Sequence, residues 1–202
     1  MKIYDFTQAP NPRRVRIFLA EKGISVPYVQ VNIGTAENRQ PAFLAKNPMG
    51  TLPVLEFDDG AFLAESVAIC RYFEEQKPEP NLMGRDSRER AFIEMWQRRM
   101  EFEVLNLTAQ SFRNTTEFFK GRIPQNKEYA EVCRNTAIKR FEWLDKELAN
   151  RPYIAGDRFT IADISAMVGV DFGRLTNIRI QPEQTNLKRW HDSVSSRPSA
   201  KA

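Results

Sequence analysis

The stretch that decides the fold runs from Asn47 to Ser66 and reads NPMGTLPVLEFDDGAFLAES. Two short apolar runs within it, residues 54–55 and 61–63, flank an Asp-Asp-Gly turn at residues 58–60. Because Asp-Gly between apolar runs is a strong hairpin signal, the stretch predicts a strand, a tight turn and a second strand. The residues after Ser66 then follow a helical pattern, so we expect a helix to begin where the second strand ends.

The start of that helix is the predicted chemical centre of the chain. Backbone N–H groups in the first turn of a helix have no partners inside it, and the helix dipole places partial positive charge there. The N–H and hydroxyl of Ser66 could therefore hold a ligand carboxylate, and Glu65 could accept a hydrogen bond from a ligand ammonium group. A cis bond before Pro53 would also turn the N–H and C=O of Leu52 outward to pair with an extended peptide. The pattern favours an amino-acid-like, peptide-bearing ligand.

The residues before this stretch have the pattern of a β-α-β unit. Residues 2–6 predict a strand, 7–12 a proline-rich loop, 13–22 a helix that Gly23 ends, and 27–31 a second strand. A polar loop with a short helix, residues 33–46, leads into the hairpin, and the helix after Ser66 is expected to end near Glu75. This β-α-β then β-β-α order predicts a mixed, four-stranded sheet with helices on its faces, the thioredoxin-like arrangement.

The second half of the chain has a different pattern. The segment QKPEPNLMGR, residues 76–85, has two prolines and no periodicity, which predicts a linker between domains. Beyond it, apolar residues recur at helical spacing from about residue 87 to 118 and again from 129 to 148. Thr160 and Asp163 have the spacing of a capping box, and residues 187–194 predict a closing helix before a frayed tail. We therefore expect an all-helical second domain, with Asp163 as a stability residue.

Composition excludes several classes of function. The chain has 202 residues, 42% hydrophobic and 28% charged, with a net charge of +4, as in ordinary globular proteins. Basic pairs such as Arg13-Arg14 lack interleaved aromatic residues and are interpreted as solvated faces, which argues against a nucleic-acid partner. One histidine and two cysteines without metal spacing, Cys70 and Cys133, predict inert buried thiols, a reduced cytoplasmic compartment and no metal. The sequence predicts no signal peptide and no membrane span.

Two runs of the sequence resemble a known family. Residues 47–75, NPMGTLPVLEFDDGAFLAESVAICRYFEE, closely resemble the glutathione-binding half of the cytosolic glutathione transferases of bacterial type. Residues 153–172, YIAGDRFTIADISAMVGVDF, resemble the buried capping-box helix of the same family. The resemblance implies a thioredoxin-like glutathione-binding domain over residues 1–77. It implies an all-helical domain over residues 87–202 that contributes the electrophile site.

The resemblance also implies an activity: attack of glutathione thiolate on an electrophilic small molecule, in detoxification, by a cytoplasmic homodimer. Glutathione would be the co-substrate, with its cysteinyl backbone, γ-glutamyl end and glycine carboxylate held separately. In that order, the residues implied to bind it are Leu52 and Pro53, then Glu65 and Ser66, then Asn38 and Gln40. Five residues of the long helix are candidates to line the electrophile site: Arg98, Arg99, Phe102, Asn106 and Phe112.

The residue that activates the thiol departs from the family pattern. A free thiol has a pKa of about 8.5, so a donor aimed at sulfur raises the thiolate fraction. Aligning residues 14–17 with serine-type members places Ala9 where the catalytic serine would be and Asn11 where some members carry cysteine. Some bacterial members use asparagine in a Pro-Asn step, so Asn11, through its side-chain amide or its N–H, is the leading catalytic candidate.

Several alternatives remain open at this point. Asn11 could be only a turn residue or helix cap before Pro12, and Thr7 is the other available hydroxyl, since Tyr4 is expected in the core. At the level of function, the same site suits a glutathione-dependent reductase of disulfides or peroxides. The missing serine also suits a non-catalytic, transferase-like interaction module.

Overall fold

The computed structural model describes residues 1–202 and divides into two compact units, residues 1–81 with 201–202, and residues 82–200. The first unit contains a four-stranded sheet with the strand order β2-β1-β3-β4. Its strands are β1 (Lys2–Asp5), β2 (Tyr28–Gln30), β3 (Val54–Glu56) and β4 (Phe62–Ala64). β1 pairs in parallel with β2 and antiparallel with β3, which pairs antiparallel with β4. The mixed, thioredoxin-like sheet predicted from the sequence is confirmed.

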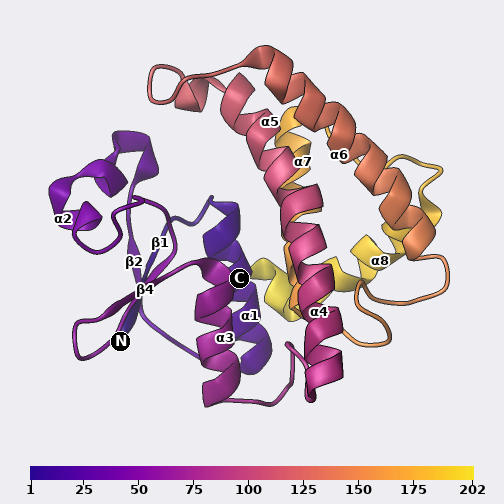
Figure 1. Cartoon of the computed structure of the whole chain (residues 1–202), viewed down its shortest axis with the longest axis horizontal. Coiled ribbons are helices and arrows are strands. Elements are labelled where there is room, and N and C mark those ends of the chain that lie inside the picture. The colour runs from indigo at the N-terminus through magenta and orange to yellow at the C-terminus, as the bar shows by residue number, and fades with distance from the viewer. The chain divides into compact units, whose positions relative to one another are not determined.

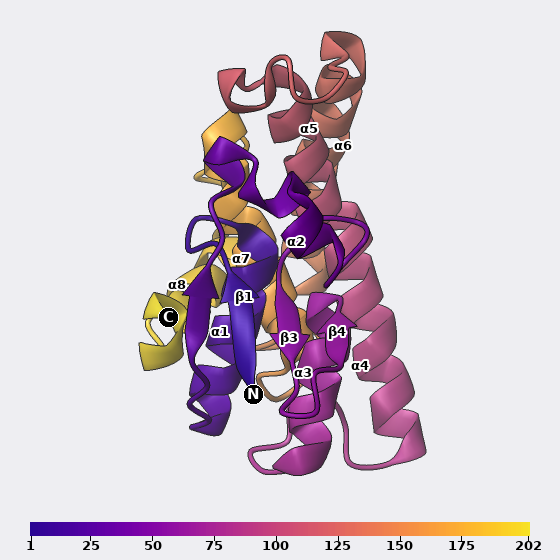
Figure 2. The same ribbon diagram turned by 90° about the vertical axis from the view of Figure 1, so that its left-hand side faces the viewer.

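Helices cover both faces of this sheet. They are α1 (Pro10–Lys22), α2 (Pro41–Leu44) and α3 (Ser66–Gln76), with two short 3-10 turns, η1 (Ile33–Thr35) and η2 (Glu37–Arg39), before α2. Figures 1 and 2 show α1 and α3 side by side on one face and α2 on the other. Gly23 ends α1 with a φ of 59°, as predicted.

The start of α1 corrects the sequence analysis. The helix begins at Pro10, so the loop predicted over residues 7–12 is shorter than expected. Proline is tolerated in the first helical turn because the N–H that it lacks would have no partner there and its φ already suits a helix. As a consequence, Asn11 belongs to the first turn of α1 and not to a loop.

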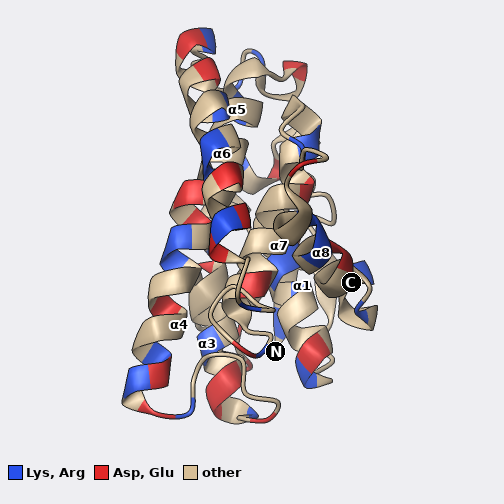
Figure 3. Cartoon of the chain, turned by 90° about the vertical axis from the view of Figure 1, so that its right-hand side faces the viewer, with Lys and Arg blue, Asp and Glu red and all other residues tan.

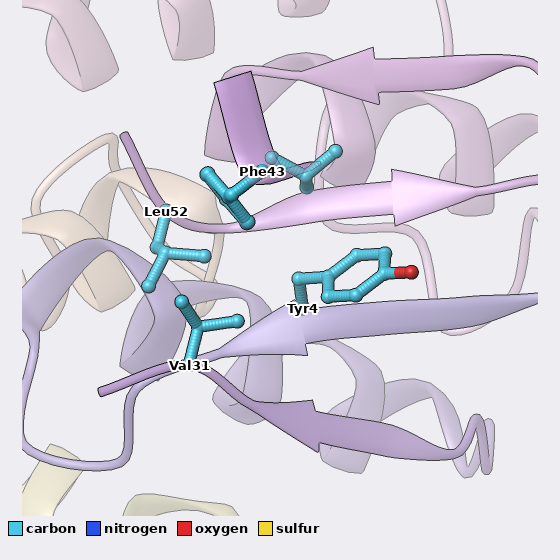
Figure 4. Packing of buried hydrophobic residues seen from close by; sticks show 5 residues of the cluster. Tyr4, Val31, Phe43 and Leu52 are labelled. Atoms are coloured by element: carbon cyan, nitrogen blue, oxygen red, sulfur yellow. The ribbon is translucent and has the colours of Figure 1, made fainter. Parts of the chain in front are cut away.

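A small hydrophobic cluster on the α2 side of the sheet reaches the predicted site. Its buried members are Tyr4, Val31, Phe43, Leu52 and Val54 (Figure 4). Tyr4 is 8% exposed, and its ring meets that of Phe43 edge to face at 6.0 Å, which confirms the expectation of a core tyrosine. Because the Leu52 side chain is anchored in this cluster, the backbone of the segment before Pro53 has a fixed position.

The second unit is all-helical, as predicted. Its helices are α4 (Ser87–Met100), α5 (Leu107–Thr115), α6 (Lys127–Glu147), α7 (Ile161–Gly173) and α8 (Thr185–Ser195). Short turns follow several of them: η4 (Glu117–Phe119), η5 (Arg174–Thr176) and η6 (Pro198–Lys201). The tail predicted to fray therefore forms a turn of 3-10 helix. Lys, Arg, Asp and Glu are mixed along α4 and α6 (Figure 3), and no helix has the length and apolar character needed to cross a membrane.

The helix predicted from residue 87 to 118 is continuous but changes form midway. Between α4 and α5 it adopts a π-helical segment, η3 (Glu101–Asn106), and α5 ends at Thr115. α7 approaches this segment closely at Gly169, where an added Cβ would lie 2.9 Å from Cγ1 of Val104 and 3.0 Å from the backbone N of Leu105. A larger residue at position 169 would therefore push α7 away from η3.

The capping box of α7 is confirmed and is fully buried. The Thr160 N–H donates to Oδ2 of Asp163 at 2.9 Å, and the Thr160 side chain accepts from the N–H of Ala162. Asp163 Oδ1 accepts from the N–H of Ile154 at 2.8 Å and from Nε1 of Trp190 at 2.9 Å. Burial raises the pKa of the Asp163 carboxyl to about 6, against these hydrogen bonds, which favour the ionised form. Asp163 therefore joins three segments of the helical unit.

Candidate functional site

The predicted peptide-binding segment has backbone groups that make no hydrogen bond within the chain. The Leu52–Pro53 bond is cis, and the Leu52 side chain is buried in the sheet cluster. No hydrogen bond within the chain uses the N–H or C=O of Leu52. An extended peptide laid along this segment could therefore take both groups, as in the addition of a strand to a sheet edge.

Two buried asparagines hold the loop that leads into this segment. Nδ2 of Asn47 donates to the C=O of Thr51 at 2.9 Å, and Nδ2 of Asn38 donates to the C=O of Gly50 at 2.7 Å. Gly50 has a φ of 61°, and a Cβ there would lie 2.8 Å from Nη1 of Arg39. The loop is thus built around a glycine and locked by side-chain amides.

These contacts distinguish the two residues that were expected to hold a glycine carboxylate, Asn38 and Gln40. Asn38 is 5% exposed and its amide nitrogen is already bound to the loop, while its Oδ1 has no hydrogen-bond partner. Gln40 is exposed at the start of α2, and its side chain makes no capping bond there. Of the pair, Gln40 is the side chain with a donor available to a ligand.

The start of α3 has the features of an anion site. Ser66 is the first residue of α3, and Glu65 before it has a φ of 70°, a left-handed conformation that is unusual for a residue with a side chain. The Glu65 carboxylate is exposed and does not cap the helix. The N–H groups of the first turn of α3 therefore remain without a side-chain cap, next to a carboxylate that faces solvent.

A buried arginine lies directly behind Ser66. Arg14, on α1, is fully buried, and its Nη1 donates to Oγ of Ser66 at 2.7 Å. The prediction of a solvated Arg13-Arg14 pair is therefore wrong for Arg14. The missed signal is helical spacing, because Arg14 lies one turn before the buried Phe18 and shares its face of α1.

Asn11 lies at the open end of α1, between two prolines. The N-cap of α1 is Ala9, so the exposed Asn11 side chain does not cap the helix. Pro10 and Pro12 lack N–H groups, and the Arg13 N–H donates to the C=O of Ala9 at 3.2 Å. The N–H of Asn11 is therefore the one backbone donor left open in the first turn, where the helix dipole favours negative charge.

The two alternative hydroxyls are engaged elsewhere. Thr7 Oγ1 donates to Oε1 of Gln30 at 3.0 Å. Tyr4 donates its hydroxyl to Oε2 of Glu56 at 2.6 Å. Neither hydroxyl is free in the way that the N–H and side-chain amide of Asn11 are.

The two cysteines are buried, as predicted. Burial raises the pKa of the Cys70 thiol to about 12, so Cys70 stays protonated at neutral pH and has little nucleophilic character. Cys133 is 2% exposed on α6. Neither side chain is positioned as a catalytic thiol.

The residues predicted to line an electrophile site make separate contacts within the helical unit. Arg98 stacks 4.0 Å above the half-exposed ring of Phe102, whereas Arg99 lies over the ring of Trp96. Phe112 packs edge to face against Phe119 and Phe172. A cavity of about 320 Å³ at the start of α4 is lined by Arg85, Glu89, Phe92 and Arg158, among others, and by none of the predicted residues.

Comparison with known proteins identifies the family. The family model of the glutathione S-transferase N-terminal domain matches residues 3–81, and that of the C-terminal domain matches residues 96–198. Over its whole length the chain is 38% identical to "Glutathione S-transferase 2" of Saccharomyces cerevisiae, of which it covers 88%.

Solved structures agree with this result. The crystal structure of Gtt2 from Saccharomyces cerevisiae superposes with a TM-score of 0.95 at 38% identity, covering 100% of this chain and 99% of that one. The Gtt2-class glutathione S-transferase of Vibrio parahaemolyticus gives a TM-score of 0.87 at 33% identity, covering 100% and 96%. The predicted family and fold class are confirmed: the chain belongs to the glutathione S-transferases, a family of enzymes.

Proposed function

We propose that the protein binds glutathione on its first unit and conjugates it to an electrophilic small molecule. The observation that carries the proposal is the start of α3, where an exposed carboxylate, Glu65, adjoins uncapped helical N–H groups and the Ser66 hydroxyl. A γ-glutamyl group has an ammonium and a carboxylate on one carbon. The pairing of one acceptor with several donors therefore matches both of its charges.

The other parts of glutathione would be held by different kinds of group. The open N–H and C=O of Leu52 before Pro53 would pair with the cysteinyl backbone. Gln40 would donate directly to the glycine carboxylate. Asn38 would act through the loop, since its amide already binds the Gly50 carbonyl.

Asn11 is the proposed activator of the thiol. Its open N–H and its exposed amide lie at the N-terminus of α1, where negative charge is stabilised. A thiolate held there would have a lowered pKa and a larger nucleophilic fraction at neutral pH. No hydroxyl is required for this role, which accounts for Ala9 at the position of the serine.

The setting of the reaction is carried over from the family. The helical unit would supply the surface that receives the electrophile. The protein would work as a cytoplasmic homodimer in detoxification, with glutathione as co-substrate and with no metal. Light scattering coupled to size exclusion tests the dimer directly.

Glutathione-dependent reduction of disulfides or peroxides is the second candidate function. The observation that favours it is the asparagine at position 11, since an amide donor stabilises a thiolate without supplying a reactive group. The test is calorimetric titration with glutathione, together with conjugation of a chloronitrobenzene by wild type and by Asn11→Ala and Ser66→Ala. Binding with turnover that falls in Asn11→Ala supports the transferase. Binding without conjugation favours reduction, and no binding at millimolar glutathione leaves an interaction module.

A further inference from the structure

We propose that Arg14 is a positioning residue that makes the site selective for the α-carboxylate of the γ-glutamyl group, acting through Ser66. The inference rests on the proposed function, because it specifies how that site recognises glutathione. Arg14 does not itself contact the ligand in this proposal. It fixes the direction of a neighbouring hydroxyl and adds positive charge behind it.

The hydrogen bond between Arg14 and Ser66 determines which hydrogen bonds the Ser66 hydroxyl can make to a ligand. A serine hydroxyl has one hydrogen to donate and two lone pairs to accept with. Arg14 Nη1 donates to Oγ of Ser66 at 2.7 Å, so one lone pair is used and the hydroxyl hydrogen points elsewhere. Ser66 is therefore held as a donor beside the N–H groups of the first turn of α3, and these donors suit a carboxylate.

Because Arg14 is buried, its charge interacts strongly with neighbouring groups. The side chain has 0% exposure, and a guanidinium stays ionised at all ordinary pH values. Charges within a low-dielectric interior interact more strongly and are screened less by salt than charges at the surface. A fixed positive charge one hydroxyl away from the anion site would favour a charged carboxylate over a neutral group.

A second buried cation on the same face of α1 provides a matched comparison. Lys22 lies two turns after Arg14 and is 1% exposed. Its Nζ lies 2.6 Å from Oε2 of Glu74 and donates to the C=O of Lys77 at 2.6 Å and of Pro80 at 2.9 Å. Lys22 joins the end of α1 to the end of α3 and the residues after it. Removing it should therefore destabilise the unit and leave the hydrogen bond at the start of α3 in place.

The test measures a preference rather than an affinity. Calorimetry is performed with glutathione and with its decarboxylated analogue, 4-aminobutyryl-cysteinylglycine, which lacks only the α-carboxylate. Hydrogen bonds to charged groups contribute roughly 10- to 100-fold, so we expect wild type to prefer glutathione by about 100-fold. Arg14→Met should reduce this preference to about tenfold, mainly by weakening glutathione binding. Arg14→Lys should give an intermediate preference, and Lys22→Met should keep that of wild type while unfolding at a lower temperature.

Other outcomes would overturn the inference. If Arg14→Met weakens both ligands by the same factor, the role of Arg14 is structural only, and the glutathione proposal still stands. If wild type binds neither ligand at millimolar concentration, the proposed function fails and this inference fails with it. Should Arg14→Met not fold, the decision rests on Ser66→Ala with and without Arg14→Lys. Loss of preference in Ser66→Ala, with no further loss in the double variant, supports the mechanism, and additive losses contradict it.

Discussion

The helices α3 and α7 begin in opposite ways. At α7, Thr160 and Asp163 satisfy the open N–H groups from inside the chain, and both side chains are buried. At α3, no side chain caps the helix, Glu65 is strained and exposed, and Ser66 is held as a donor by Arg14. The first arrangement completes the fold and leaves nothing for a ligand. The second leaves donors and charge unused, which is the condition for binding an anion.

The comparison predicts the largest stability effect at α7. Asp163→Ala removes the acceptor for the N–H groups of Thr160 and Ile154 and for the Trp190 indole, and leaves these donors buried. We expect a loss of about 4 kcal/mol in the free energy of unfolding, measured by urea denaturation. A loss below about 1 kcal/mol would show that the start of α7 is not closed by Asp163.

The second prediction uses the pKa of the same carboxyl. Burial raises the Asp163 pKa from 3.8 to about 6, so between these values the folded protein binds a proton that the unfolded chain has released. The associated stability is fully present below pH 3.8 and is lost as the pH rises through 6, roughly 3 kcal/mol in all. We expect the stability of wild type relative to Asp163→Asn to fall by this amount between pH 4 and pH 7. A difference that rises with pH would mean that the folded-state pKa of this carboxyl lies below 3.8, contrary to a shift caused by burial.

At α3 the largest expected effects are on binding. Ser66→Ala removes the ligand-facing hydroxyl, which also accepts the buried hydrogen bond from Nη1 of Arg14, so we expect glutathione affinity to fall about tenfold. Because Nη1 of Arg14 loses this acceptor, the free energy of unfolding without ligand should fall by about 1 to 2 kcal/mol, less than in Asp163→Ala. Calorimetry and urea denaturation measure the two effects, and Thr160→Ala is the matched control. That control should lose about 1 kcal/mol of stability with unchanged glutathione affinity. If Thr160→Ala weakened glutathione binding and Ser66→Ala did not, the ligand site would not lie at the start of α3.

The smallest change in the free energy of unfolding is expected at Glu65, and we expect it to be an increase. Glycine adopts a φ of 70° without strain, so Glu65→Gly should relieve the backbone and raise the free energy of unfolding by about 0.5 kcal/mol. It should also weaken glutathione binding, because the acceptor for the ligand ammonium is lost. Thermal unfolding with and without glutathione separates the two effects. A variant that is both less stable and unimpaired in binding would contradict the account of α3.

Local signals in the sequence explain how much of the fold could be predicted. The Asp-Gly turn, the helical spacing of apolar residues and the spacing of Thr160 and Asp163 report on neighbours in the sequence, and the elements that they predict are present. The resemblance to the glutathione transferases then indicated glutathione as the ligand. What could not be predicted depends on contacts between distant residues. Helical spacing places Arg14 on the face of the buried Phe18, but only the packing of α1 against α3 shows that its guanidinium meets Ser66.

Asn38 and Asn11 show the same limit within the site. Its position in the sequence indicates that Asn38 lies near the glycine carboxylate of a ligand. Its amide instead donates to the C=O of Gly50, and this contact crosses a loop whose path no local pattern reveals. For Asn11, the sequence offers only its alignment with family members. Its open N–H follows from the exact start of α1, and helix starts are the least predictable part of a helix.

A glutathione site at the start of α3 is tested most directly by a glutathione titration followed by the backbone amide signals of the isotope-labelled protein. If glutathione binds there, the Ser66 and Leu52 signals should shift together and saturate with one binding constant, while Thr160 and Asp163 stay unchanged. The Asn11 signal should join them when the thiol is ionised at higher pH. Saturating shifts around α7 with none at Ser66 would place the ligand away from the start of α3.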